Sequence, residues 1–261
     1  MLYVELATQL RRVRSLILFG VLVGLPILAG ATQASKAGGR GGLATYSALN
    51  FTEGGLNFMV PLLFGLVAAV FGAILGGADR DWGTLRYLYV RPVSRRRLLA
   101  GKWWALVVCS ALAIATFVAV ALLTGIMVFG WHPYHRSGAS DLSAPTATVA
   151  ILAAAGYLTV CLLSVGSIAL ALGLLLPRSV EALGITIAFL IGSVMLDNVS
   201  AVHNIIVILP VHYWLRWTQL FSGTDTGGSS GIILGLVARA GAIVVALTAA
   251  YMMLSRRDPA A

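Results

Sequence analysis

A serine motif near the end of the chain could carry hydrolytic chemistry, but it has no base. The segment GGSSG at 227–231 matches the G-x-S-x-G pattern that presents a nucleophilic serine. Such a serine needs a base, normally histidine, within hydrogen-bonding reach. An intramembrane serine protease would place that histidine on a later helix, yet none follows Ser229. We therefore interpret this segment as a polar turn before a last helix.

The histidines and aspartates do not form a pattern typical of metal binding or acid–base catalysis. Two histidines lie close together in the segment HPYH at 132–135, but proline separates them and few acidic residues are near. The aspartates Asp141, Asp197 and Asp225 are scattered over separate segments. We expect no metal site and no catalytic residue in this chain.

The sequence also lacks a complete phosphate-binding loop. That loop needs G-x-x-x-x-G-K-[ST], in which backbone N–H groups surround the phosphates and the hydroxyl binds Mg²⁺. The nearest match ends in Gly101-Lys102, but Arg96 stands in place of the first glycine and Trp103 in place of the hydroxyl residue. We expect no cofactor in this chain, so any ATP and Mg²⁺ must be bound by a partner.

Composition indicates a membrane protein. Hydrophobic residues make up 59% of the 261 residues and charged residues only 10%, whereas soluble domains carry about 25% charged residues. The formal net charge of +9 is divided among short segments between apolar runs. This pattern favours anionic lipid headgroups over nucleic acid as the partner.

Six apolar segments are long enough to cross a membrane as helices, which takes about 20 residues each. We expect an all-α fold, a single domain over 1–261, with a further interfacial helix over 1–14. The proline at 61 is expected inside the second span, where neighbouring helices tolerate it. The expected spans are 15–33, 58–77, 103–130, 148–176, 180–201 and 231–254.

The distribution of lysine and arginine predicts the orientation. Thirteen fall in the termini and in the connections after spans two and four, against four in the connections on the other side. Positive residues stay in the cytoplasm, so both termini are expected inside, in the cytoplasmic membrane of a bacterium. Residues 11–31 also imitate a signal peptide. Cleavage is disfavoured because it would place the largest basic block outside.

Arg239 lies deep inside the sixth expected span, whereas Glu181 and Asp197 lie near the ends of the fifth. An arginine in the middle of a membrane helix is costly and is treated as functional by default. Asp197, near the outer end of the fifth span, is its candidate ion-pair partner within the chain. The alternative is that the arginine extends to the outer headgroups.

The basic block from 80 to 104 holds seven of the chain's 18 lysines and arginines. Its apolar side chains recur at helical spacing, which predicts a short amphipathic helix at the membrane surface. Pro92 ends that helix, and Ser94 can cap a second helix that continues into span three. The stripe consists of Trp82, Leu85, Leu88 and Tyr89. The simplest interpretation is a topology signal, but it leaves the proline corner unexplained.

This block resembles the segment after span two in the membrane subunits of ABC-2 type transporters. The shared pattern is an acidic residue, Gly-Thr, an apolar stretch, Pro-x-Ser-Arg and a lysine that opens span three. Here it reads Asp79, Gly83, Thr84, the stretch 85–90, Pro92, Ser94, Arg95 and Lys102. Asp79 stands where the family usually has glutamate, which shortens its reach. Six spans, an N-terminal interfacial helix and short outer helices over 202–230 agree with the same family.

The resemblance implies a role as the permease subunit of an ATP-driven exporter. A coupling region over 79–102 would dock on a separate ATP-binding subunit, and a second membrane subunit, identical or homologous, would complete the translocation path. The spans carry hydroxyls but only one full charge, which favours amphiphilic cargo such as drugs, lipids or peptides. The residues expected to couple to the ATPase are Asp79, Trp82, Gly83, Thr84, Leu85, Arg86, Pro92, Ser94, Arg95 and Lys102.

Two other functions stay open at this point. A stand-alone membrane enzyme acting on lipid or peptide would need polar groups that converge near one membrane face. A membrane anchor that recruits an ATPase without transporting anything would share every feature of the coupling region. Pairs of glycines four residues apart, at 20 and 24, 72 and 76, and 231 and 235, allow close helix packing within the chain or between subunits.

Overall fold

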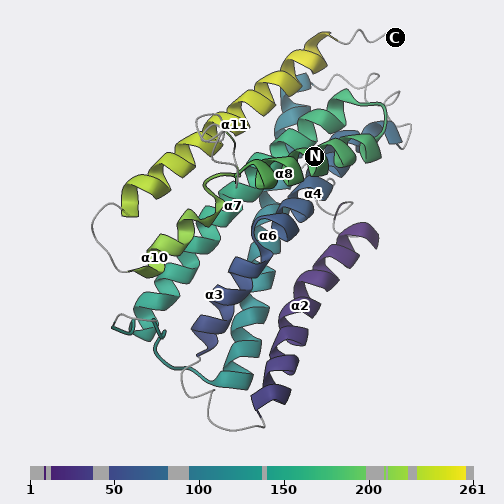
Figure 1. The fold of residues 1–261 in the computed structure, drawn as a ribbon. Helices are drawn as coiled ribbons and strands as arrows, with labels where there is room; N and C mark the ends of the chain where they lie inside the picture. The colour runs from purple at the N-terminus through teal and green to yellow at the C-terminus, as the bar shows by residue number, and fades with distance from the viewer. Residues whose placement is uncertain are drawn as a thin grey trace.

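The computed structural model describes residues 9, 13–37, 47–81, 94–136, 140–197, 209, 211–222 and 228–256. These residues form helices and short connections without a β-strand. One antiparallel bridge joins Tyr134 to Leu142. The fold class expected from the sequence, all-α, is therefore confirmed for the described part of the chain (Figure 1).

Nine helical elements follow one another along the described residues, and five are long and apolar enough to cross a membrane. At 1.5 Å per residue, the 35 residues of the longest helix exceed a hydrocarbon layer of about 30 Å. The elements are α2 (Val13–Ala37), α3 (Ala48–Met59), α4 (Leu62–Asp81), α6 (Arg95–Phe129), α7 (Ala144–Leu175), α8 (Ser179–Asp197), η3 (Trp214–Thr218), α10 (Gln219–Ser222) and α11 (Gly228–Arg256). The five candidate spans are α2, α6, α7, α8 and α11.

The second expected span, 58–77, is corrected by the structure. Its place is taken by α3 and α4, which are bent by 62° at the break between them. Pro61 lies at this break. The break is expected there because proline lacks an N–H and disfavours helix at the residue before it. Helix also begins earlier than expected, at Ala48, where the Ser47 side chain accepts a hydrogen bond from the backbone of Asn50. The bent pair makes a sixth span only if it crosses as one unit.

The other helix boundaries lie close to the expected ones. Ser94 precedes α6 with an extended backbone, and the helix runs on through span three as expected, although the serine hydroxyl makes no capping bond. Residues 198–201 of the fifth expected span lie outside the described residues. The expected interfacial helix at 1–14 also lies largely outside them, while Val13 and Arg14 belong to α2.

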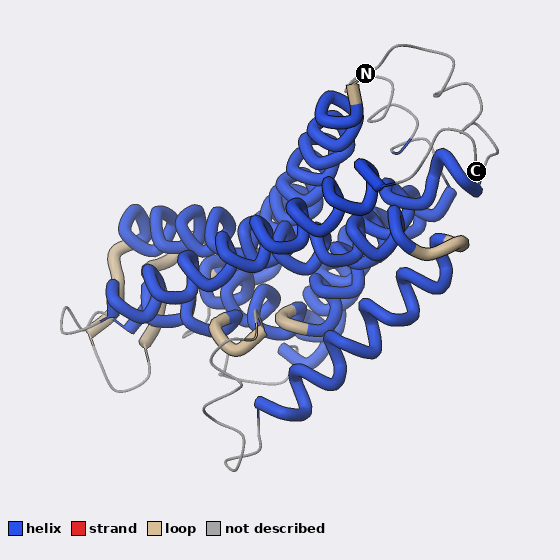
Figure 2. Tube along the Cα trace, turned by 90° about the horizontal axis from the view of Figure 1, so that it is seen from above, coloured by secondary structure: helices blue, strands red, loops and turns tan. Residues whose placement is uncertain are grey.

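The core is organised around α7, which packs against α4, α6, α8 and α11. Glycines allow α4 and α7 to approach most closely, since a Cβ at Gly72 would lie 2.2 Å from the Gly166 carbonyl oxygen. The glycine pair at 72 and 76 therefore packs within the chain. By contrast, a Cβ at Gly20 or Gly24 would meet nothing within 4 Å. Figure 1 shows α2 and α11 on opposite flanks, and Figure 2 shows the bundle from above.

Candidate functional site

One end of the bundle, where α4 ends and α6 begins, carries Arg95, Arg96 and Arg97 and is called here the basic end. Part of the expected coupling region lies outside the described residues, and Asp79 is described by its backbone only, in the last turn of α4. Ser94, Arg95 and Lys102 are described in full. The coupling residues that lie outside are Trp82, Gly83, Thr84, Leu85, Arg86 and Pro92.

Arg95 joins the start of α6 to the end of α11. Its Nη1 donates hydrogen bonds to the carbonyl oxygens of Leu254 and Ser255, both at 2.6 Å. The last carbonyls of a helix have no partner within that helix and carry the negative end of its dipole. A guanidinium is therefore a suitable cap, and the contact fixes two helices that are distant in sequence.

A second arginine strengthens the same junction. The Arg96 guanidinium carbon lies 5.5 Å from the ring centroid of Tyr251, and its Nε donates to the tyrosine hydroxyl at 3.3 Å. A cation over the face of an aromatic ring is attracted to the ring by about 0.5–1 kcal/mol at exposed sites. The first turn of α6 is thus held to the last turns of α11 by two consecutive arginines.

Lys102 joins α6 to α4, whereas Arg95 and Arg96 join α6 to α11. The side chain is fully buried, and its ammonium donates to the Leu75 carbonyl oxygen at 2.7 Å. A buried ammonium without an acceptor would be costly, so this contact fixes the position of the lysine. The helices on both sides of 82–93 are therefore connected directly, α4 to α6 through Lys102 and α6 to α11 through Arg95.

Arg239 lies in the middle of α11 and is fully buried. Its Nε donates to the Cys161 sulfur at 2.8 Å, and its Nη1 donates to the Gly235 carbonyl oxygen at 3.0 Å. Its guanidinium also lies 5.1 Å from the ring centroid of Tyr157. Its Nη2 has no hydrogen-bond partner among the described residues. A sulfur, a carbonyl and a ring thus surround the cation in place of a carboxylate.

The expected ion pair between Arg239 and Asp197 is not formed in the structure. Asp197, the last residue of α8, contacts the Nδ1 of His212 instead. α8 packs on α4 and α7, whereas α11 packs on α6 and α7, so the two charges are on different neighbours of α7. The alternative, extension of Arg239 to the headgroups, does not occur in the described chain either, because the side chain is buried.

Tyr157 connects the buried arginine to the segment before α11. Its hydroxyl donates to the Tyr213 carbonyl oxygen at 2.6 Å. A Cβ at Gly235 would lie 2.4 Å from that hydroxyl, so glycine is needed for the contact. Trp214 and Trp217 of η3, which packs on α7 and α11, are fully buried. Short helices expected within 202–230 are confirmed for η3 and α10.

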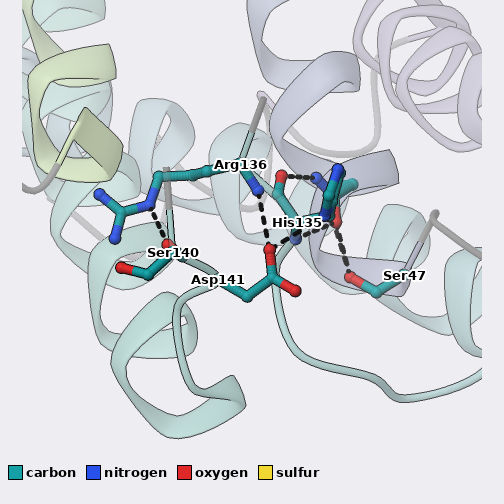
Figure 3. A network of polar contacts seen from close by, with 6 residues as sticks. Ser47, His135, Arg136, Ser140 and Asp141 are labelled. Carbon is teal, nitrogen blue, oxygen red and sulfur yellow. Dashed lines mark hydrogen bonds and ion pairs between the residues drawn. The ribbon is translucent and has the colours of Figure 1, made fainter. Parts of the chain in front are cut away.

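A polar network closes the end opposite the basic end, where α6 ends and α7 begins (Figure 3). The Asn50 side chain pairs with the backbone of His135, donating at 2.8 Å and accepting at 3.0 Å. The His135 ring contacts Asp141 at 2.9 Å. The loop after α6 is thereby attached to the start of α3. Burial raises the pKa of the neighbouring Tyr134 to about 12, and the charge of Glu53 contributes.

The sequence indicates which site residues are unusual but not which groups they contact. The importance of Arg95, Lys102 and Arg239 follows from charge inside or beside apolar runs. Their partners, which are backbone carbonyls, a thiol and a ring, leave no local signal in the sequence. No group of three or more His, Cys, Asp or Glu side chains that could hold a metal occurs within the described residues.

The fold and the apolar helices define a multi-pass helical membrane protein. The chain belongs to the family described as Protein of unknown function (DUF2705), whose model matches residues 36–260. That match covers all described helices after α2. No curated protein matches the chain.

Proposed function

We propose that this protein is the permease subunit of an ABC-2 type ATP-driven exporter. It would form the translocation path with a second membrane subunit and take its energy from separate ATP-binding subunits. The proposal rests on the resemblance of 79–102 to that family. The observation that supports it best is the pair of contacts by which Arg95 and Lys102 fix α6 to α11 and to α4.

These contacts give the proposed coupling region a mechanical route into the bundle. A partner that moves the segment at 82–93 also moves the helix ends on both of its sides. Lys102 connects α6 to α4, and Arg95 connects α6 to α11. A displacement of the segment is therefore shared by all three helices rather than absorbed in one loop. ATP-driven closure of two partner subunits could then bias the bundles between two states.

The proposed docking surface combines apolar and basic side chains. Trp82 and Leu85 would bury in a groove of the ATPase, and arginines would pair with acidic residues at its rim. In this proposal the basic end and both termini face the cytoplasm of a bacterial cell, in agreement with the charge bias of the connections. The cargo would be amphiphilic, because the spans carry few charges.

The proposal is tested by affinity purification of the chain from its native membrane, with identification of the proteins that accompany it. We expect an ATP-binding subunit in near-equal amount. The double variant Trp82→Asp, Leu85→Asp should release this subunit, because each aspartate would place a charge in an apolar groove. Purification of the variant without the ATPase, at normal membrane levels, is the expected result.

The matched control places the same two changes at the opposite end. Trp131 and Leu215 are exposed there, at 47% and 50%, so Trp131→Asp, Leu215→Asp should keep the ATPase bound. Purification of the unmodified chain without any ATPase would contradict the proposal. Equal loss of the subunit in both double variants would show that aspartates at these positions disturb the fold rather than a docking surface.

A further inference from the structure

A cavity of about 550 Å³ lies between α2, α3 and α6. This volume falls within the range of about 300–1,000 Å³ that is typical of small-molecule sites. Its inner wall is buried, and Leu28 and Phe58, 63% and 72% exposed, stand at its mouth. The lining residues are Leu25, Pro26, Leu28, Ala29, Thr32, Gln33, Asn50, Phe51, Gly54, Gly55, Phe58, Met59, Phe117 and Ala121.

The hollow exists because two adjacent residues of α3 have no side chains. A Cβ at Gly54 would meet nothing within 4 Å, and one at Gly55 would meet only the tip of Phe117, at 3.3 Å. Glycine in a helix costs about 1 kcal/mol relative to alanine. Both glycines line the cavity, so a side chain at either position would occupy part of this space.

The polar groups of this cavity gather at one end. Thr32 and Gln33 lie near the end of α2, and Asn50 lies near the start of α3. The Thr32 hydroxyl donates to the Ala29 carbonyl oxygen at 2.9 Å, and Asn50 is engaged by His135. No described residue hydrogen-bonds the Gln33 amide, so it can donate and accept toward a ligand.

The uncharged lining of the cavity favours uncharged amphiphiles over charged ones. None of the lining residues is ionisable, so a charged headgroup would enter this site without a counter-ion. A neutral hydroxyl-bearing head can instead exchange hydrogen bonds with a primary amide. The apolar remainder of the cavity, with Phe51, Met59 and Phe117 on its wall, fits a hydrocarbon chain.

We propose that the cavity between α2, α3 and α6 binds a single-chain amphiphile with an uncharged, hydroxyl-bearing head. The chain lies between Phe51, Phe117 and the two glycines, and the head lies at Gln33. The volume holds one such molecule rather than a two-chain lipid. The site does not depend on the proposed role in export, because occupancy is a property of this chain alone and needs no ATPase.

The test uses the full chain in phosphatidylcholine liposomes and a monoacylglycerol that carries a photoreactive diazirine in its chain. After illumination, mass spectrometry locates the adducts. We expect labelling of the peptide that contains Phe58 to saturate with probe concentration, since a site fills whereas bulk lipid contact does not. Unlabelled monoacylglycerol should compete, and the corresponding fatty-acid anion and alkyl-trimethylammonium cation should not.

Two variants address the two parts of the site. Gly54→Leu places a side chain in the cavity at a position where the Cβ meets nothing within 4 Å. It should raise the half-saturating concentration at least about tenfold, a change of about 1.4 kcal/mol. Gln33→Leu removes the exposed amide that binds the neutral head. It should weaken binding of the neutral probe until the neutral and charged probes bind alike. The control Gly156→Leu makes the same change at an open position on α7, where a Cβ also meets nothing within 4 Å. It should label like the unmodified chain.

Three results would overturn the proposal. Labelling that rises linearly with probe concentration would indicate bulk lipid contact. Equal labelling of Gly54→Leu, Gly156→Leu and the unmodified chain would place the probe elsewhere. Adducts between two protein chains at Phe58, in place of adducts with the probe, would show that a second copy of this chain covers the cavity.

Discussion

At the scale of single residues, Arg239 is the most unusual feature of the described chain. An arginine at the centre of a membrane helix costs about 2.5–3.5 kcal/mol on insertion scales. Here it is fully buried, and its Nη2 has no hydrogen-bond partner among the described residues. Its position is held by Cys161, Gly235 and the ring of Tyr157. Replacing buried charges by apolar residues of similar volume is often neutral or stabilising when no opposite charge is left unpaired, and no carboxylate is among these contacts of Arg239.

We therefore predict that Arg239→Met leaves the thermal unfolding temperature unchanged or raises it, whereas Arg239→Lys lowers it. Lysine keeps the charge but cannot form the two directed bonds to the Cys161 sulfur and the Gly235 carbonyl. The measurement is thermal unfolding of the purified protein in one fixed detergent. A lower unfolding temperature for Arg239→Met than for the unmodified chain would contradict this prediction and show that the guanidinium stabilises the fold.

The sequence reveals that Arg239 is special but not what it touches. Its place in an apolar run is visible in the letters alone, and so is the nearest acidic residue in the neighbouring span. Asp197 is the partner that charge predicts, yet Asp197 pairs with His212 and the cation lies against Cys161. Which face of α11 turns toward α7 depends on packing between helices, and one sequence does not carry that information.

At the scale of elements, the close approach of α4 and α7 determines where the other helices can lie. Gly72 and Gly76 face the backbone of α7, and the added Cβ atoms would lie 2.2 Å and 2.5 Å from the carbonyl oxygens of Gly166 and Leu170. Backbone atoms cannot move aside as a flexible side chain can. Small residues in such positions allow van der Waals packing between membrane helices.

Gly72→Ala should accordingly destabilise the protein by about 1–3 kcal/mol, the range for overpacked cores. Gly24→Ala is the matched control in α2, because its Cβ meets nothing within 4 Å. Alanine there should be neutral or slightly stabilising, since it favours helix. Thermal unfolding of both variants in the same detergent makes the comparison. Equal stability of the two variants would contradict the close packing of α4 on α7.

The elements themselves were largely predictable from the sequence. Long apolar runs without charges predicted helices, and the boundaries of α6, α7 and α11 agree with them within several residues. The break at Pro61 was not predicted, because proline inside a membrane helix is often tolerated, as Pro26 is in α2. Proline at 61 accounts for a break at this point, but the 62° angle between the two helices is not specified by the local sequence.

At the scale of the whole molecule, the bent pair α3–α4 decides the topology. If it crosses the membrane as one unit, the basic end lies on the same side as the start of α2. If it enters and leaves on one side, the basic block lies with the end of α2 instead. The charge bias of the connections favours the first arrangement.

Cysteine labelling separates the two arrangements. The native Cys109 and Cys161 are fully buried and should not react with a membrane-impermeant maleimide. We predict that His132→Cys is labelled in intact cells, because His132 is exposed at the end opposite the basic end. Arg91→Cys should be labelled only after the membrane is permeabilised. Labelling of Arg91→Cys from outside would show that α3 and α4 do not cross as one span.

The proposed function requires that the segment between α4 and α6 docks on an ATP-binding subunit. The most direct test places a photoreactive amino acid at Leu85 in the native cell, with the same change at Leu215 as the control at the opposite end. Illumination should join the chain to an ATP-binding protein from position 85 and not from position 215. Adducts at 85 with lipid alone, or the same partner from both positions, would contradict it and leave the basic block as a topology signal.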